Sequence, residues 1–136
     1  MNRICYIDDF NQIRFQKTDQ LIMIDGIKCE KAEDFYKIIY ALLGFPYENN
    51  YSLDAFNDWM TDCHFFYSDS IKIIIINNDF FLIKDIQFKE KIKKLFEESI
   101  LPYWEKDVEK ICLGGKVKMF NIFVLNNWFY YLWEGK

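Results

Sequence analysis

The sequence of 136 residues lacks most of the residue patterns that carry catalytic chemistry. It has one histidine, His64, and contains neither G-x-x-x-x-G-K-[ST] nor G-x-G-x-x-G, which excludes the common phosphate-binding loops. Cys63 adjoins the histidine, but adjacent residues project in different directions and do not form a nucleophile–base pair by proximity alone. One histidine and scattered carboxylates also make a weak metal site. We therefore expect no enzymatic activity, no metal and no cofactor.

Long hydrophobic runs and paired cysteines are missing as well. The longest purely aliphatic run, Ile73–Ile76, is far too short to span a bilayer, and no apolar segment follows a basic one at the N-terminus. The four cysteines are widely spaced, with no C-x-x-C pair: Cys5, Cys29, Cys63 and Cys112. Scattered cysteines in a chain without a signal peptide are typical of reduced, mostly buried thiols. We expect a cytoplasmic protein that does not contact membranes.

Positive charge is absent from one long window of the chain. No lysine or arginine lies between Lys37 and Lys72, whereas five acidic residues do: Glu48, Asp54, Asp58, Asp62 and Asp69. Of the 21 acidic residues this leaves 16 elsewhere, against 17 basic ones, so the net charge of −4 comes from this window. The window is also rich in aromatic residues. An acidic, aromatic surface suits a basic protein partner and repels nucleic acid, the alternative being a merely solvated surface.

The hydrophobic pattern indicates one α/β domain, residues 1–136. With 51% hydrophobic and 20% aromatic residues the chain can bury a substantial core. Strands are predicted at 21–25, 71–77 and 119–125, and helices at 31–43, 53–63 and 88–100, with Pro102 breaking or restarting the last. Strands alternating with helices predict a small three-stranded parallel sheet packed with helices.

Extra strands are predicted at both ends of this core, which spans residues 20–125. Residues 3–7 and 12–16 flank the sequence DDFN and predict a hairpin extension over residues 1–17. In the tail, residues 126–136, a tight turn at Asn126-Asn127 would return 128–133 as an antiparallel edge strand.

The clearest amphipathic pattern lies at residues 53–63. On a helical wheel its apolar residues fall on one side. The other side holds Asn57, Thr61, Asp54, Asp58 and Asp62. Ser52 is placed to cap the N-terminus of this helix.

Three roles are open for the aspartates of this helix: catalytic acids, metal ligands, or a charged surface that meets a basic partner. Asp54 has a simpler explanation, because the positive end of the helix dipole favours a carboxylate there. Asp58 and Asp62 gain little from the dipole, and like charges four residues apart repel by roughly 0.2–0.5 kcal/mol per pair. Adjacent turns of one exposed helix offer no catalytic cleft, so we favour the partner-facing surface.

Three stretches, LIMIDG, FPYENNYSLDAFNDWM and IKIIIIN, follow one another in a recognisable spacing. Over roughly residues 20–125 the chain resembles the barstar family of ribonuclease inhibitors. Pro46, Leu53, Asp54, Ala55 and Asp58 match the family pattern, in which a Tyr-Tyr-Gly-x-Asn-Leu-Asp-Ala-Leu-Trp-Asp segment follows a proline. The resemblance implies a barstar-like fold whose helix and preceding loop plug a ribonuclease active site.

The resemblance also implies which residues bind the toxin. Asp54 and Asp58 would occupy phosphate positions among the basic side chains of the nuclease. The stretch LFEES matches a family helix that carries an inhibitory glutamate, which places that role on Glu98. With Asp62 from the helical wheel, the other implied binding residues are Tyr47, Glu48, Tyr51 and Asn57.

Three of these residues depart from the family pattern. Asn57 stands where the family has tryptophan, Glu48 where it has tyrosine, and Tyr51 near a usual glutamate. Because these are contact positions, we expect a target other than the family's best-known ribonuclease.

We therefore predict an inhibitor or immunity protein that forms a 1:1 complex with a basic ribonuclease toxin and blocks its active site. Its partner would be neither nucleic acid nor membrane. The alternative is a barstar-like interaction module with a non-nuclease partner.

Overall fold

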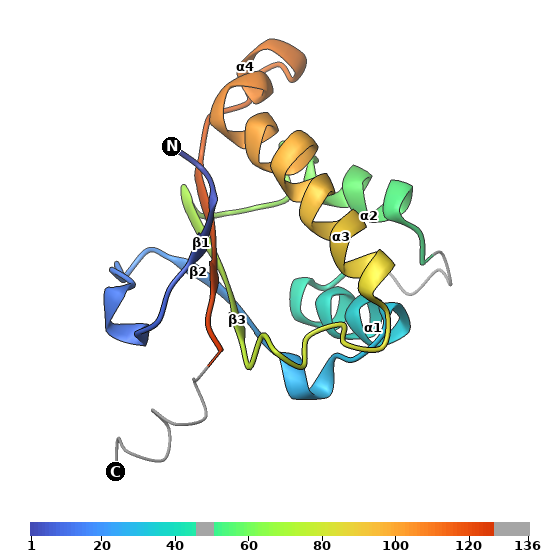
Figure 1. Ribbon diagram of the computed structural model, residues 1–136. Coiled ribbons are helices and arrows are strands. Elements are labelled where there is room, and N and C mark those ends of the chain that lie inside the picture. The colour runs from blue at the N-terminus through green and yellow to red at the C-terminus, as the bar shows by residue number, and fades with distance from the viewer. Residues whose placement is uncertain (46–50, 127–136) are drawn as a thin grey trace.

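A run of isoleucines forms an interior strand of the sheet. The computed structural model describes residues 1–45 and 51–126. Its strands, in chain order, are β1 (Ile4–Tyr6), β2 (Gln20–Asp25), β3 (Ser70–Ile76) and β4 (Met119–Val124). They form one sheet in the order β1-β4-β3-β2, and every pairing is parallel (Figure 1). The predicted α/β fold, with β2, β3 and β4 as its parallel sheet, is confirmed.

Helices cover one face of this sheet (Figure 1). They are α1 (Ala32–Leu43), α2 (Leu53–Met60), α3 (Ile86–Leu95) and α4 (Val108–Ile111), with short 3-10 turns at Phe10–Gln12 and Gly26–Lys28. No helix in the described ranges is long and apolar enough to cross a membrane.

The helix that begins at Ile86 continues without interruption to Ile111, so the predicted break at Pro102 is wrong. Two π-helical stretches, Phe96–Ile100 and Tyr103–Asp107, lie on either side of the proline. A proline ring clashes with the carbonyl four residues earlier in a regular α-helix, and the wider π turns relieve that clash.

The strand β3 is buried on both faces. Ile71, Ile73 and Ile75 belong to the large core beneath the helices. Ile74 and Ile76 belong to a smaller cluster on the opposite face, together with Ile13 and Leu125. Ile13 comes from the segment between β1 and β2. A strand with seven buried residues is typical of a parallel sheet covered on both sides.

The predicted N-terminal hairpin is wrong. β1 pairs in parallel with β4, placing Cys5 opposite Phe123, and residues 12–16 form no strand. The chain after β1 instead crosses the second face of the sheet to reach β2 at the opposite edge (Figure 1). Pairing with β4 satisfies the backbone of β1 without a partner from 12–16. The predicted edge strand at 128–133 lies outside the described residues.

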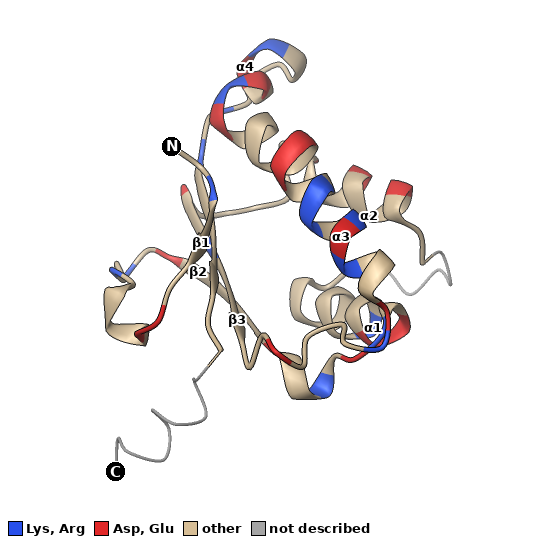
Figure 2. Ribbon diagram, viewed as in Figure 1, with Lys and Arg blue, Asp and Glu red and all other residues tan. Residues whose placement is uncertain are grey.

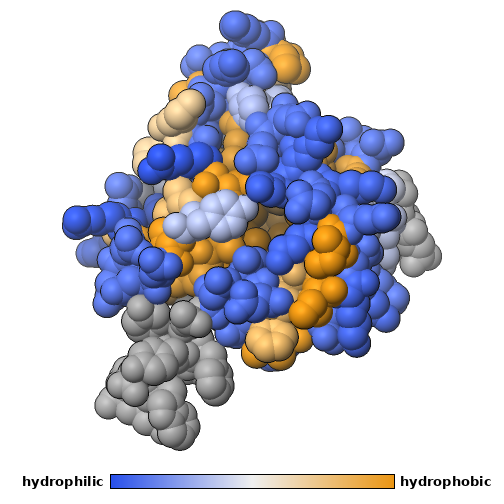
Figure 3. All heavy atoms as spheres, viewed as in Figure 1, coloured by the Kyte–Doolittle hydropathy of each residue, from blue (hydrophilic) through white to orange (hydrophobic). Residues whose placement is uncertain are grey.

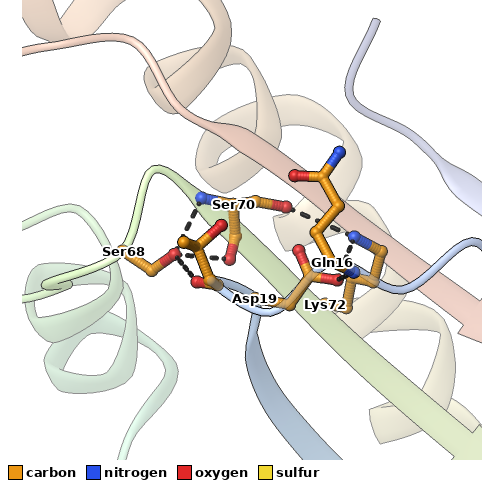
Figure 4. A network of polar contacts seen from close by, with 6 residues as sticks. Gln16, Asp19, Ser68, Ser70 and Lys72 are labelled. Atoms are coloured by element: carbon orange, nitrogen blue, oxygen red, sulfur yellow. Dashed lines mark hydrogen bonds and ion pairs between the residues drawn. The ribbon is translucent and has the colours of Figure 1, made fainter.

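A buried ion pair attaches this crossing segment to the sheet. Lys72 Nζ of β3 lies 2.8 Å from Asp19 Oδ2, and the two side chains are only 7% and 1% exposed. Lys72 also donates to Ser70 Oγ at 3.3 Å, and Ser68 Oγ donates to the carbonyls of Thr18 and Ser70 (Figure 4). Lys72 points to the face of the sheet that holds the smaller hydrophobic cluster. A charge buried there needs a partner because it is removed from water.

The turn after β2 explains the glycine of LIMIDG. A Cβ on Gly26 would lie 2.2 Å from the carbonyl oxygen of Asn77, so only glycine allows this approach of two backbones. Asp25 Oδ1 accepts hydrogen bonds from the Ile27 N–H and from Asn77 Nδ2, both at 3.0 Å. The motif therefore holds the ends of β2 and β3 together.

An apolar cavity of about 110 Å³ opens between the sheet and α3. Its walls include Ile4, Ile122 and Phe96, and Lys89 and Lys93 of α3 stand at its border. Figure 3 shows it as a hydrophobic hollow framed by hydrophilic residues.

Replacing Asp19 with alanine should lower the free energy of unfolding by about 3–5 kcal/mol, because the buried ammonium of Lys72 loses its partner. Urea unfolding at pH 7 measures this. Asp69→Ala is the matched control: it removes an 88% exposed carboxylate from Lys118 and should change stability little. Equal stability of Asp19→Ala and wild type would contradict the assigned role.

The same pair predicts a pH dependence. Burial raises the pKa of Asp19, but hydrogen bonds from Lys72, the Gln16 N–H and Ser70 outweigh it and lower the pKa below its ordinary value. A lowered pKa in the folded state means that the stabilisation is complete above the unfolded pKa of about 4 and is lost as the pH falls through the folded value. The stability difference between wild type and Asp19→Ala should therefore shrink below about pH 4, as urea titrations at several pH values would show.

Candidate functional site

The helix α2 begins as the sequence predicts. Ser52 has an extended backbone and its Oγ accepts a hydrogen bond from the Ala55 N–H at 3.1 Å, which caps the first turn. Asp54 lies in that turn, where the helix dipole favours a negative charge. Both Asp54 and Asp58 are exposed, one turn apart.

The opposite face of α2 is locked into the core. Phe56 and Met60 are fully buried. The ring of Phe56 packs edge-on against Phe35 at 5.4 Å, and the carbonyl of Met60 accepts a hydrogen bond from Trp104 Nε1 at 2.8 Å. The predicted amphipathic split is therefore confirmed over Leu53–Met60, and the two aspartates stand on a helix with little freedom to rotate or shift.

A polar contact ties α2 to the long helix that carries Glu98. Ser99 Oγ donates to Asn57 Oδ1 at 2.9 Å. Glu98, the residue before Ser99, is exposed on the π-helical stretch Phe96–Ile100. Figure 2 shows acidic positions on α2 and on this neighbouring helix. The contact thus brings Asn57 and Ser99 together and places the Glu98 segment beside α2.

This contact changes the interpretation of Asn57. Its side chain is half-buried and its oxygen is engaged within the protein. Asn57 therefore links α2 to the long helix that carries Glu98 from within the protein. The sequence contains no signal for Ser99 as its partner, because the two residues are 42 positions apart.

Tyr51 forms part of an aromatic cluster. Its ring stacks on Tyr36 at 5.4 Å and packs edge-on against Tyr40 at 5.2 Å. Burial raises the pKa of Tyr36 to about 12, so its hydroxyl stays neutral. Tyr36 and Tyr40 are both buried. Tyr47 and Glu48 lie outside the described residues.

Asp62 lies beyond the end of α2, because the helix ends at Met60 and not at residue 63 as predicted. Its carboxylate Oδ1 accepts a hydrogen bond from the His64 N–H at 2.9 Å, and its carbonyl accepts one from the Phe65 N–H. Thr61 Oγ1 donates to the Asn57 carbonyl at 2.7 Å at this same end. Asp62 is half-buried and shapes a turn, so the structure does not place it on the α2 face with Asp54 and Asp58.

Two of the four cysteines are not free thiols. Cys63 and Cys112 form a disulfide between the turn after α2 and the end of α4, with 6.5 Å between their Cα atoms. This corrects the expectation of reduced cysteines throughout, which failed because sequence spacing does not reveal that the two residues meet. Cys29 is free and buried, as expected, and burial raises its thiol pKa to about 12.

The fold and this helix face together define a small α/β protein with exposed carboxylates on the helical side of a parallel sheet. The chain belongs to the barstar family: the family model described as Barstar (barnase inhibitor) matches residues 20–113. The match includes α2 and Glu98 and leaves out β1 and β4. The comparisons with curated proteins and with solved structures found no match. The resemblance inferred from sequence is therefore confirmed at the level of the family.

Removing the helix cap should destabilise the fold. Ser52→Ala leaves the Ala55 N–H without its side-chain acceptor and should lower the free energy of unfolding by about 1 kcal/mol. Ser52→Asp keeps an acceptor at the same position and should retain most of the stability. Urea unfolding of the three proteins compares them. If the alanine and aspartate variants lose stability equally, the effect does not come from the cap.

Proposed function

We propose that this protein is an inhibitor, or immunity protein, that binds a cytotoxic ribonuclease in a 1:1 complex and blocks its active site. The binding surface is the exposed face of α2 with Asp54 and Asp58, extended by Glu98 on the adjacent helix. The producing cell is protected because the complex forms in its cytoplasm before RNA is cut.

One observation carries the proposal: two exposed aspartates lie one turn apart on a helix whose other face is fixed in the core by Phe56 and Met60. Like charges at this spacing repel in the free protein. A basic partner removes that cost and adds charge-assisted hydrogen bonds to the same oxygens. Ribonuclease active sites bind phosphate through arginine, lysine and histidine, so fixed carboxylates can take the positions of successive phosphates.

The rigidity of this surface supports a role in binding. Side chains and helices that are already ordered lose little conformational entropy when a partner binds. The Asn57–Ser99 hydrogen bond sets the position of α2 relative to the segment of Glu98. A nuclease would thus meet one preformed arrangement of carboxylates. Tyr47, Glu48, Tyr51 and Asp62 remain proposed contacts at the border of the surface, and Asn57 is proposed to tune specificity through the orientation that it sets.

Membership of the family described as Barstar (barnase inhibitor) supports a ribonuclease as the partner. The departures at residues 48, 51 and 57 favour a different nuclease as the target, because the family resemblance makes them contact positions. A barstar-like module with a non-nuclease partner would use the same surface but leave RNA cleavage unaffected, and the experiment below separates the two functions.

The direct test is RNA cleavage by a basic ribonuclease toxin, beginning with any that is encoded beside this gene, with the protein titrated in. Cleavage should stop at one equivalent. Asp54→Ala and Asp58→Ala should each weaken binding by about 2–5 kcal/mol, because each leaves a basic group of the nuclease buried without its carboxylate. Calorimetry would give the affinities, and thermal unfolding should show little change in stability.

The matched control is Asp79→Ala, which removes one exposed carboxylate far along the chain from α2. It changes the net charge by the same amount and should inhibit like wild type. Binding without inhibition would favour the non-nuclease module. Wild-type affinity in the Asp54 and Asp58 variants would overturn the proposed surface.

Salt should weaken the complex mainly by slowing association. Complementary charge speeds the encounter of the two proteins, and ions screen that attraction over about 10 Å at 0.1 M. Stopped-flow measurements at rising salt should show a falling association rate for wild type and a flatter dependence for the Asp54→Ala/Asp58→Ala double variant. An association rate that does not respond to salt would contradict electrostatic recognition.

A further inference from the structure

A cluster of metal-ligating side chains lies outside the acidic face of α2. Cys63 and His64 follow α2, and Cys112 follows α4, 49 residues away from Cys63. One ligand atom from each of the three residues lies within 4.8 Å of the others. Cys112 Sγ and His64 Nε2 are 4.0 Å apart. The fold therefore gathers two sulfurs and an imidazole nitrogen that the sequence keeps separate.

These three groups are the usual ligands of zinc. Thiolates bind Zn²⁺ at about 2.3 Å and histidine nitrogens at about 2.0–2.1 Å, in a tetrahedron whose corners lie about 3.5–3.8 Å apart. All three ligand atoms already lie within 4.8 Å of one another, and once the disulfide is reduced the two sulfurs must move apart to reach this spacing. Calcium and magnesium prefer oxygen ligands, so the donor set selects a softer divalent ion.

The surroundings admit an ion from solvent. Cys63 and Cys112 are half-buried and His64 is exposed. The Asp62 carboxylate accepts from the His64 N–H and so fixes the backbone between two of the ligands. With three protein ligands, the fourth position of a tetrahedral ion would face solvent, as in sites where water or a partner's side chain completes the coordination.

The disulfide between Cys63 and Cys112 uses the same two sulfurs, so it excludes the metal. Forming it removes two electrons and two protons and requires an oxidant. Metal binding requires none, since each thiol only releases its proton to solvent as the thiolate binds the ion. In a compartment that keeps thiols reduced, the metal-binding form is the one available.

We propose that the reduced chain binds one zinc-type divalent ion through Cys63 Sγ, His64 Nε2 and Cys112 Sγ. The ion would then join the turn after α2 to the end of α4 in place of the disulfide. This site is independent of the proposed ribonuclease binding, and it differs from the sequence-based expectation of no metal.

The test is a cobalt titration of the full chain after reduction with a phosphine and removal of metals. Alkylation under denaturing conditions first verifies that all four cysteines are reduced. Co²⁺ should produce a sulfur-to-metal charge-transfer band and the visible bands of a tetrahedral ion, saturating at one equivalent. Zn²⁺ should displace the cobalt and abolish both.

Variants locate the ligands. Cys112→Ser should remove most of the charge-transfer intensity. His64→Asn should lower the Co²⁺ affinity by more than about tenfold, because losing even an outer-shell partner of a ligand costs about 10–100-fold. Cys5→Ser is the matched control, since this free cysteine lies on β1 and should leave the titration unchanged. Circular dichroism checks that each variant is folded.

Two outcomes would overturn the site. One is the absence of a charge-transfer band in reduced, folded wild type, which would leave the pair as a disulfide only. The other is a band that survives Cys112→Ser or disappears in Cys5→Ser, which would place the cobalt elsewhere.

Discussion

The burial of β3 on both faces is the constraint on which the rest of the structure depends. Burying a single isoleucine side chain stabilises a fold by about 1.5–3 kcal/mol, and this strand has five of them in seven residues. Such a strand cannot lie at a sheet edge or face water. It therefore requires parallel neighbours on both sides, helices over one face and a chain segment over the other. The 7–19 segment fulfils the last requirement, and the Lys72–Asp19 pair holds it there.

The acidic face of α2 depends on that core in turn. The buried side chains of Phe56 and Met60 and the hydrogen bond from Trp104 hold α2 in place. The carboxylates on its exposed face therefore have fixed positions. Carboxylates on a mobile helix would lose ordering entropy on binding, whereas these are ordered beforehand. The hydrogen bond between Asn57 and Ser99 extends the same order to a second helix. A residue that contributes through orientation can thus alter a binding surface without contacting the partner.

Most helices and strands were predicted from local patterns because their positions depend on residues that are close together in the chain. Ser52 capped α2 as expected, Gly44 ended α1 in the left-handed conformation, and IKIIIIN formed the buried strand. The failures have physical causes at longer range. Residues 3–7 and 12–16 have strand-like alternation, but β1 pairs with β4, 118 residues away in the chain. Cys63 and Cys112 were expected to be reduced, but the fold brings them together from 49 positions apart.

The amphipathic order of residues 53–60, the exposure of Asp54 and Asp58, and the motifs of the barstar family could be read from the printed chain, because each depends on neighbours within one or two turns. Three features depended on the folded chain: the partner of Asn57, the crossing of residues 7–19 over the sheet, and the meeting of Cys63, His64 and Cys112. These contacts join residues 42 or more positions apart in all three cases. No local propensity encodes such pairs, since they form only when burial of β3 has brought the helices onto one sheet.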